Sequence, residues 1–451
     1  MNNIRNNYVN MVCLVLINSI IIIYPITLYF SDFVGKHAPA YYLGLLNHEI
    51  VFSATILLLS GLSLLINSNK KILNITKEKL YLFIMLAALV GWINLSSLWS
   101  LSAYMSAPEI GVWTSYLLWW ILMLSLFEKN DCYIIIQIIM ISIILSASVY
   151  ISYFINDYYT PYFLLNINRS IVSECLLAIS PFLLGYGLQK ERLEGNLCVL
   201  LSFISLVAII LIGQRAPLYS MLAIMSLLVI SVAIHWERMR KKILFFGASL
   251  IIMLSCIIMA NPHKKSSDHW DTVSRTYNIN QASETLDYRI NGFLVCWYQW
   301  KDQWLFGTGQ GTYQMSYPLY AHHLPLNEYA RFSRRLENSQ VSRAHCEPVQ
   351  IAAELGIFGI TLWLAIFIVY PIFLAYDSIK KKQIITLCGS AGIMGVAISS
   401  LASSFATRTI LPGIIIMTVY YLSLNQMNDK KNSKNMLLSI NTCYVIHSGL
   451  H

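Results

Sequence analysis

The stretch RAHCEPVQIAAELGIFGITLW, residues 343–363, places His345 directly before a strongly apolar segment that carries Gly356 and Gly359. The apolar part has the composition of a membrane helix, so the stretch predicts a polar group held at a membrane surface. Arg289 upstream and Arg215 further back would add two guanidinium groups. The sequence therefore predicts a polar site on one side of an otherwise apolar protein.

Composition places the chain among membrane proteins. It has 451 residues, of which 57% are hydrophobic and 12% charged, whereas average soluble domains have roughly 45–50% and 25%. We expect an all-α polytopic membrane protein with one membrane domain, residues 1–425. This domain would include a water-facing, partly helical insertion at 261–350, and a tail would follow at 426–451.

Apolar runs of about 17–25 residues, the length that crosses a bilayer, recur along the chain. They predict spans at 10–31, 49–67, 80–99, 112–127, 133–154, 170–188, 196–213, 217–236, 243–260, 351–376, 384–403 and 409–425. The first run follows a basic residue, as in a signal peptide, but no small-residue cleavage site follows it, so we expect it to remain as the first of about twelve helices. The insertion then lies between helices nine and ten.

The distribution of basic residues predicts the orientation, because cytoplasmic loops are enriched in Lys and Arg. The segments on one side hold Arg5, Lys70, Lys71, Lys77, Lys79, Lys129, Lys190, Arg192, Arg238, Arg240, Lys241, Lys242, Lys380, Lys381, Lys382, Lys430, Lys431 and Lys434. The short loops on the other side hold Lys36, Arg169, Arg215 and Arg408. Both termini are therefore expected in the cytoplasm, and the net charge of +9 indicates topology and does not imply nucleic-acid binding.

The insertion contains one helical pattern. Residues 284–304 repeat apolar side chains at a helical spacing, which would lay a tryptophan-rich face on the membrane surface and present Arg289 near the start. The run FGTGQGTYQMSYPLY (306–320) predicts a glycine-rich turn, and residues 321–341, with His322 and His323, an exposed loop. The glycine run follows no strand, so it does not favour a dinucleotide site. Whether Cys296 and Cys346, both in the insertion, form a disulfide stays open.

The spacing of His345, Cys346, Gly356 and Gly359 resembles the signature of the O-antigen ligase superfamily. Three further features agree: Arg215 in GQRAPL, Arg289 in YRINGFLVCWYQW, and the glycine-rich turn GTGQGTY. Members of that family look like twelve-helix proteins with a large loop between helices nine and ten. One departure is Cys346, since the residue after the histidine is usually Asn, Ser or Gln in that pattern, which puts an amide or hydroxyl role there in doubt.

The resemblance implies a membrane glycosyltransferase at the periplasmic face of a bacterial inner membrane. It would move a preassembled glycan from undecaprenyl diphosphate to lipid A core oligosaccharide, with inversion and with neither a metal nor a cofactor. Arginine suits this chemistry, because its planar fork binds phosphate oxygens bidentately and stays charged. Arg215 and Arg289 would hold the diphosphate, and His345 would accept the proton of the attacking hydroxyl, as general bases near neutral pKa do.

Several alternatives remain open at this point. A polymerase that joins repeat units, or an oligosaccharyltransferase that modifies protein Ser or Thr, would use the same active site with another acceptor. A lipid-linked glycan flippase or transporter is a further hypothesis, although the sequence has no evident two-fold repeat and its polar candidates cluster at the outer face.

Each singled-out residue also has an ordinary structural interpretation. Arg215 could cap a helix at the interface, and Gly356 and Gly359 are typical of close helix packing. Arg169 and Arg408, at outer ends of spans, are further candidates for substrate contact. Glu174 and Glu354 lie inside predicted spans, where carboxylates are usually paired or functional, but the sequence assigns neither a step.

Overall fold

The computed structural model describes residues 75–126, 136, 169–190, 193–212, 214–260, 279–324, 343–403 and 406–425. The described elements are helices: α3 Lys77–Ser96, α4 Ala103–Leu126, α6 Arg169–Gln189, α7 Leu193–Ile212, α8 Arg215–His235, η3 Glu237–Met239, α9 Arg240–Ala260, α11 Ile279–Asp302, α12 Tyr313–Ala321, α14 Glu347–Leu364, η4 Ala365–Val369, α15 Tyr370–Lys381 and α16 Ile384–Ser399. A further apolar helix covers Ile410–Asn425. The all-helical fold class predicted from composition is thus confirmed for the described part of the chain.

Five of the described helices are long and apolar enough to cross a membrane: Lys77–Ser96, Ser170–Gln189, Leu193–Ile212, Arg215–His235 and the continuous stretch Glu347–Lys381. These helices indicate a multi-pass membrane protein. The predicted spans 10–31 and 49–67, nearly all of 133–154, and the tail 426–451 lie outside the described residues, so the count of twelve stays a prediction.

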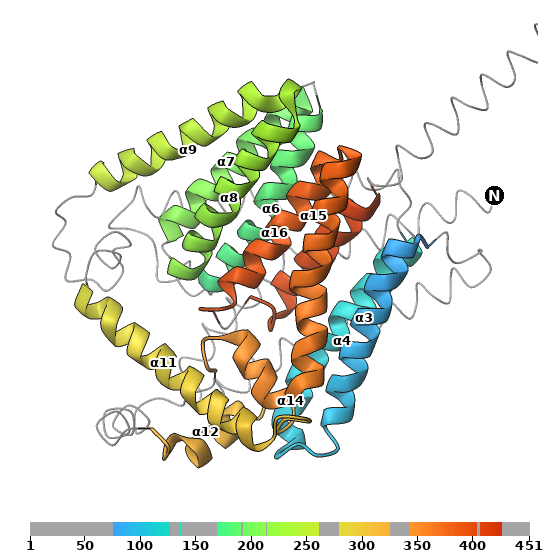
Figure 1. Cartoon of the computed structure of the whole chain (residues 1–451), viewed down its shortest axis with the longest axis vertical. Helices are drawn as coiled ribbons and strands as arrows, with labels where there is room; N and C mark the ends of the chain where they lie inside the picture. Colours follow the sequence, from blue (N-terminus) through green and yellow to red (C-terminus); the bar gives the residue numbers. More distant parts are fainter. Residues whose placement is uncertain are drawn as a thin grey trace, which may run out of the picture.

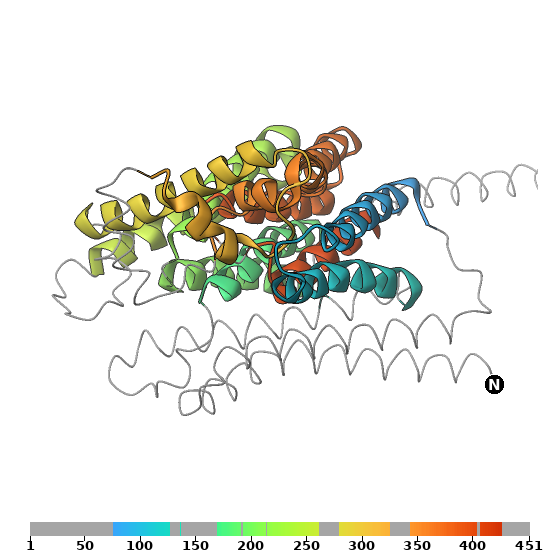
Figure 2. The same cartoon turned by 90° about the horizontal axis from the view of Figure 1, so that it is seen from below.

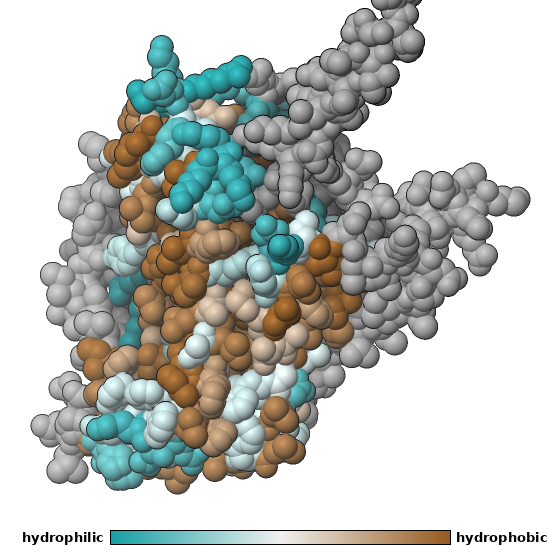
Figure 3. All heavy atoms as spheres, turned by 45° about the vertical axis from the view of Figure 1, so that its right-hand side comes forward, coloured by the Kyte–Doolittle hydropathy of each residue, from teal (hydrophilic) through white to brown (hydrophobic). Residues whose placement is uncertain are grey.

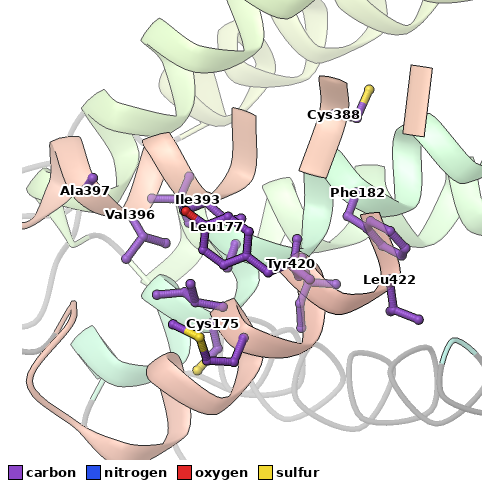
Figure 4. Packing of buried hydrophobic residues seen from close by; sticks show 14 of the residues in the cluster. Cys175, Leu177, Phe182, Cys388, Ile393, Val396, Ala397, Tyr420 and Leu422 are labelled. Carbon is purple, nitrogen blue, oxygen red and sulfur yellow. The ribbon is translucent and has the colours of Figure 1, made fainter. Parts of the chain in front are cut away.

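The core is built where α6 packs against α16. Leu177 and Phe182 of α6 gather with Ile393 and Val396 of α16 and with buried residues of the last helix (Figure 4). Small residues allow the close approach, because a Cβ on Gly392 would lie 2.2 Å from the Ala178 carbonyl oxygen. Small residues at helix interfaces are typical of membrane bundles, where backbone proximity replaces hydrophobic exclusion from water.

The bundle of described helices has two ends with different contacts. At one end, Lys382 donates from Nζ to the His235 carbonyl oxygen at 2.6 Å, which joins the ends of α8 and α15. At the other end lie α11, α12 and the start of α14, at the bottom of Figure 1 and toward the viewer in Figure 2. A broad hydrophobic zone separates hydrophilic residues at the two ends of the face in Figure 3. The lysine-rich end and the α11 end therefore face opposite sides of the apolar zone.

Several predicted boundaries need correction. Helix α4 begins at Ala103, before the predicted start at 112, and α16 ends at Ser399, before the predicted end at 403. The expected glycine turn at 306–320 is a turn only up to Thr312, because a short helix, α12, follows it. Of the predicted exposed loop 321–341, His322 and His323 are exposed, whereas Ala321 ends α12 and is buried, as is Leu324. Residues 325–341 lie outside the described residues.

The predicted span 351–376 is not one straight helix. Gly356 has φ 65° and ψ −162°, which breaks α14 into two helical parts, and a π-helical turn follows at η4. The residues before the break, Glu347–Leu355, carry most of the polar contacts described below. This broken helix positions the site.

Candidate active site

The break in α14 is filled by the glycine-rich turn that follows α11. The amide of Thr308 donates to the Ala353 carbonyl oxygen at 3.2 Å, and the amide of Gly309 donates to that of Glu354 at 2.8 Å. These carbonyls lose their helical partners at the break, and buried backbone groups must be paired. The turn therefore replaces the missing helical hydrogen bonds and is fixed against α14.

Glycines are required on both sides of this contact. A Cβ on Gly356 would lie 2.2 Å from the Leu305 carbonyl oxygen, and one on Gly307 would lie 2.3 Å from the Glu354 backbone. Both residues have φ in the left-handed region, which side chains other than glycine rarely adopt. The glycine run therefore allows the turn to approach α14 closely.

Glu354 organises the turn through its side chain. Its carboxylate, in a fully buried side chain, accepts hydrogen bonds from the Gly311 amide at 3.0 Å and the Tyr313 amide at 3.1 Å. It also accepts from Gln350 Nε2 at 2.9 Å and from Arg408 Nη2 at 2.9 Å. The sequence singles out Glu354 but assigns it no role. In the structure its carboxylate binds the backbone of the glycine turn.

The sequence predicts Arg408 at the outer end of a span, open to substrate. The structure instead buries it. It is 1% exposed and pairs with Glu354 and, through Nε at 3.3 Å, with Glu109 of α4. Burial alone would lower the pKa of Arg408, but the charges of Glu109 and Glu354 raise it. Arg408 therefore lies in the protein interior, where its guanidinium holds Glu354 and Glu109 in place.

A second carboxylate, Glu347, fixes the start of α14. It accepts from the Ala406 and Thr407 amides at 2.8 Å each and from Thr407 Oγ1 at 2.6 Å, while its own amide donates to the Ser400 carbonyl oxygen at 3.0 Å. The segment before α14 is therefore held to the loop that leads into the last helix.

His345 lies in this anchored segment in a strained conformation. Its φ is 56°, which is uncommon for a residue other than glycine and is concentrated at functional sites. The neighbouring Ala344 amide donates to Gln350 Oε1 at 3.0 Å, and Gln350 in turn reaches Glu354. The backbone next to His345 is thus connected through the side chains of Gln350 and Glu354 to the glycine turn.

The helix α11 covers the histidine segment. A Cβ on Gly292 would lie 2.7 Å from the Ala344 carbonyl oxygen, so the two backbones touch one residue before His345. Arg289 lies one helical turn before Gly292 on α11 and is half-buried. The expected helix is present, and Ile290, Phe293 and Trp297 are exposed on it. Trp304 is exposed just after its end, whereas Leu294 and Trp300 are partly buried against other residues. The contact of this face with a membrane surface stays a prediction.

Electrostatics place Arg215, Arg289 and His345 in one neighbourhood. Burial, and then the charge of Arg215, lower the pKa of Arg289. Burial lowers the pKa of His345 to about 4, with the charges of Arg289 and Arg343 as further causes. Such effects weaken with distance, so the candidate residues converge at the α11 end. The imidazole is neutral at pH 7, the form that can accept a proton.

Helix starts add positive potential at this end. Arg215 is the first residue of α8, and Ser170 Oγ at the start of α6 donates to Gln214 Oε1 at 3.2 Å. The two helix N-termini therefore lie together, an arrangement that favours anions. Arg169 is the first residue of α6, so its backbone lies at these paired helix starts. Arg408, the other predicted substrate contact, is buried.

Three residues at the site were not singled out from the sequence: Arg343, Glu109 and Glu347. Arg343 is only two residues from His345 and could have been found by that proximity. Glu109 lies in α4, far away in sequence, and no local pattern distinguishes it. Among the described residues no group of three or more His, Cys, Asp and Glu side chains is placed to hold a metal ion, and metal independence stays a prediction. Cys296 and Cys346, left open above, are free, buried thiols.

Comparison with known proteins gives one family. Residues 200–364 match the family described as O-antigen ligase, a range that includes Arg215, Arg289, His345 and the broken α14. No curated protein matches the chain. The family covers O-antigen ligases, polymerases and protein O-oligosaccharyltransferases, which are membrane glycosyltransferases that use lipid-linked glycans.

Proposed function

We propose that this chain, which carries an O-antigen ligase family domain at residues 200–364, transfers a preassembled glycan from undecaprenyl diphosphate to lipid A core oligosaccharide. The observation that carries the proposal is the grouping of two arginines, Arg215 and Arg289, with a neutral histidine, His345, at one end of the helices. The reaction would take place at the periplasmic face of a bacterial inner membrane, with both termini in the cytoplasm.

The proposed step is a single displacement. The acceptor hydroxyl oxygen attacks the anomeric carbon, the bond from that carbon to the diphosphate oxygen breaks, and the hydroxyl proton passes to the His345 imidazole. Undecaprenyl diphosphate leaves with the electron pair of the broken bond, and the anomeric configuration inverts. The step needs no metal in this proposal.

Arg215 and Arg289 would bind the diphosphate and stabilise the charge that grows on it. Fixed donors aimed at a developing charge are usually the largest contribution to such catalysis. Arg169, at the paired starts of α6 and α8, would contact the same diphosphate. The buried Arg408 would act through Glu354, by holding the glycine turn under the site.

A transfer assay tests this proposal. Purified protein in lipid vesicles would be mixed with undecaprenyl-diphosphate-linked glycan and lipid A core, and the glycosylated core measured. We expect product with the unmodified protein and a loss of at least about 10²-fold in His345→Ala, the usual contribution of a positioned acid or base. His322→Ala, an exposed histidine just after α12, is the matched control and should keep full activity.

The related polymerase and protein-directed activities are separated by a deletion strain. Loss of all glycan from lipid A core supports the ligase. Core that carries a single repeat unit supports a polymerase, and intact lipopolysaccharide with unglycosylated protein supports the third activity. Normal translocation of lipid-linked glycan by His345→Ala protein that makes no transferred product would favour a transporter.

A further inference from the structure

Trp92 of helix α3 binds the backbone of α14 at the break. Its Nε1 atom donates to the Leu355 carbonyl oxygen at 2.9 Å, and Leu355 is the residue directly before Gly356. Helix α3 lies beside α14 (Figure 1). Trp92 is far from these residues in the sequence and lies outside the family range 200–364.

Three successive carbonyl groups before Gly356 accept hydrogen bonds from outside α14. The first two, of Ala353 and Glu354, accept from amides of the glycine turn. The third, of Leu355, accepts from Trp92. Buried backbone groups are almost always paired, so the indole completes the set of contacts that the turn begins.

The ring of Trp92 contacts both chain segments that meet at the break. Its centroid lies 5.9 Å from that of Phe306, directly before Gly307, with an angle of 24° between the ring planes. It lies 5.0 Å from the centroid of Phe358, in the part of α14 after the break. Aromatic pairs at such distances attract each other. One side chain of α3 therefore holds the segment before the break through its N–H group and packs on the segments that flank it.

A tryptophan that only anchors a helix at the membrane surface would behave differently. Such tryptophans place the apolar part of the ring in the membrane and direct the N–H group toward water or headgroups. The N–H group of Trp92 instead donates to a backbone carbonyl of another helix, although the side chain is only half-buried. This direction favours a role inside the protein.

The contact is connected to the histidine segment. Leu355 follows Glu354, whose carboxylate accepts from Gln350 Nε2 at 2.9 Å. Gln350 Oε1 accepts from the Ala344 amide at 3.0 Å, directly before His345. A shift of the α14 backbone at Leu355 would therefore reach the histidine through two hydrogen bonds. Misplacement of a reacting group by about 1 Å can cost about 10²-fold in rate.

We propose that Trp92 is a positioning residue for glycan transfer, because its indole N–H group fixes the break in α14 and thereby the placement of His345. The inference rests on the proposed function as far as the reaction is concerned, whereas the contact with Leu355 does not depend on it. Trp92 itself makes no bond to substrate in this proposal.

Replacement of the N–H group alone tests this role. 3-Benzothienylalanine, incorporated at position 92 of the full-length protein, keeps two fused rings but has sulfur in place of the N–H group. The same replacement at Trp119 is the matched control, because Trp119 Nε1 donates to Thr418 Oγ1 at 3.0 Å. Trp119 lies ten residues beyond Glu109 on α4, about 15 Å along the helix.

Steady-state glycan transfer gives the first readout. At position 92 we expect kcat to fall by about tenfold or more, with KM for donor and acceptor within about twofold, because the proposed diphosphate-binding arginines are unchanged. A loss of stability alone would lower the amount of folded protein and leave kcat per folded molecule unchanged. Replacement at position 119 should not change kcat. A kcat within about twofold of the unmodified value at position 92, or an equal fall at position 119, overturns the inference.

Hydrogen–deuterium exchange of residues 306–313 gives a second readout that needs no reaction. Loss of the indole hydrogen bond should speed exchange of the Thr308 and Gly309 amides by about tenfold, and replacement at position 119 should not. If the unmodified protein transfers no glycan but this difference appears, the proposed function is contradicted and Trp92 still holds the break. If exchange is unchanged at position 92, the inference is wrong whatever the activity.

Discussion

The surroundings of His345 shift the pKa of its imidazole. Burial and the charges of Arg289 and Arg343 hold its pKa at about 4, below the ordinary value near 6.5. A lowered pKa means that the neutral, proton-accepting form persists as the pH falls from 7 to about 4. The cationic surroundings that would suit the proposed diphosphate thus also favour the unprotonated form of the proposed base.

This ionisation gives a testable pH dependence. For the free enzyme we expect the acid limb of kcat/KM to lie well below pH 6.5. Arg343→Gln should move that limb to higher pH, because it removes one charge that disfavours the imidazolium, whereas Arg240→Gln, which changes an exposed arginine at the opposite end, should not. The measurement is kcat/KM for glycan transfer across pH. An acid limb near 6.5 in the unmodified protein would contradict this view of His345.

Glu354 is the residue on which the polar framework depends. Its carboxylate joins the glycine turn, Gln350 and Arg408. Glu354→Ala would leave these buried donors unpaired and Arg408 with one carboxylate fewer, and breaking a buried ion pair costs about 3–5 kcal/mol. We expect a marked fall in the midpoint of thermal unfolding.

The matched control for Glu354 is Asp377, which pairs with Lys381 at 2.6 Å on an exposed helix surface. Asp377→Ala should cost only about 0.3–0.5 kcal/mol, since exposed i,i+4 pairs contribute little. Similar unfolding midpoints for the two variants would show that the Glu354 contacts do not hold the fold.

The broken helix α14 is the element that creates the site. Gly356 allows the break, and the turn at Gly307–Gly311 fills it. Gly356→Ala would combine a left-handed φ with a Cβ only 2.2 Å from the Leu305 oxygen. We expect a loss of stability of about 1–3 kcal/mol or more and a large loss of transfer activity.

Gly91 offers the comparison for this substitution, because it lies in helix α3 with nothing within 4 Å of an added Cβ. Gly91→Ala should leave stability unchanged or raise it by up to about 1 kcal/mol, since alanine favours helices. Unfolding of both variants followed by circular dichroism would measure the difference. Equal stabilities would contradict the requirement for a left-handed residue at position 356.

At the scale of elements, the sequence predicts helices well and their interruptions poorly. Hydrophobic runs located α6, α7, α8 and α9 within a few residues, because apolar composition is a local property. The break at Gly356 depends on the turn at Gly307, roughly fifty residues earlier in the chain, and no local pattern encodes that contact. The start of α4 and the end of α16 differ from the prediction for a related reason. Hydrophobicity does not encode the polar contacts at which these helices begin and end.

The same reasoning separates the predictable from the unpredictable part of the site. Arg215, Arg289 and His345 stand out because they are polar groups beside apolar helices, and the structure brings them together. Glu109 and the buried state of Arg408 follow from the packing of α4 against the last loop, which sequence alone does not reveal. A long-range ion pair requires the fold to be known.

The whole molecule has two ends that we expect in different compartments. Leu98, in the turn between α3 and α4, is 81% exposed at the site end, and Leu193, at the start of α7, is 83% exposed at the lysine-rich end. Cysteines at these matched positions test the orientation. We expect a membrane-impermeant thiol reagent to label Leu98→Cys in spheroplasts, and Leu193→Cys only after permeabilisation.

Unmodified protein gives the background in this experiment, and the five described cysteines are buried. Labelling of both variants in intact spheroplasts would contradict a membrane between the two ends. Labelling of Leu193→Cys alone would invert the proposed orientation and place the site in the cytoplasm.

The central claim is that His345 and Arg289, 56 positions apart in the chain, act as one catalytic unit. A double-mutant cycle measures this most directly, with kcat/KM for glycan transfer determined for His345→Gln, Arg289→Lys and the double variant. Residues that act as a unit are strongly non-additive, so we predict that the double variant is about as slow as the slower single variant. Independent effects that multiply in the double variant would contradict the account.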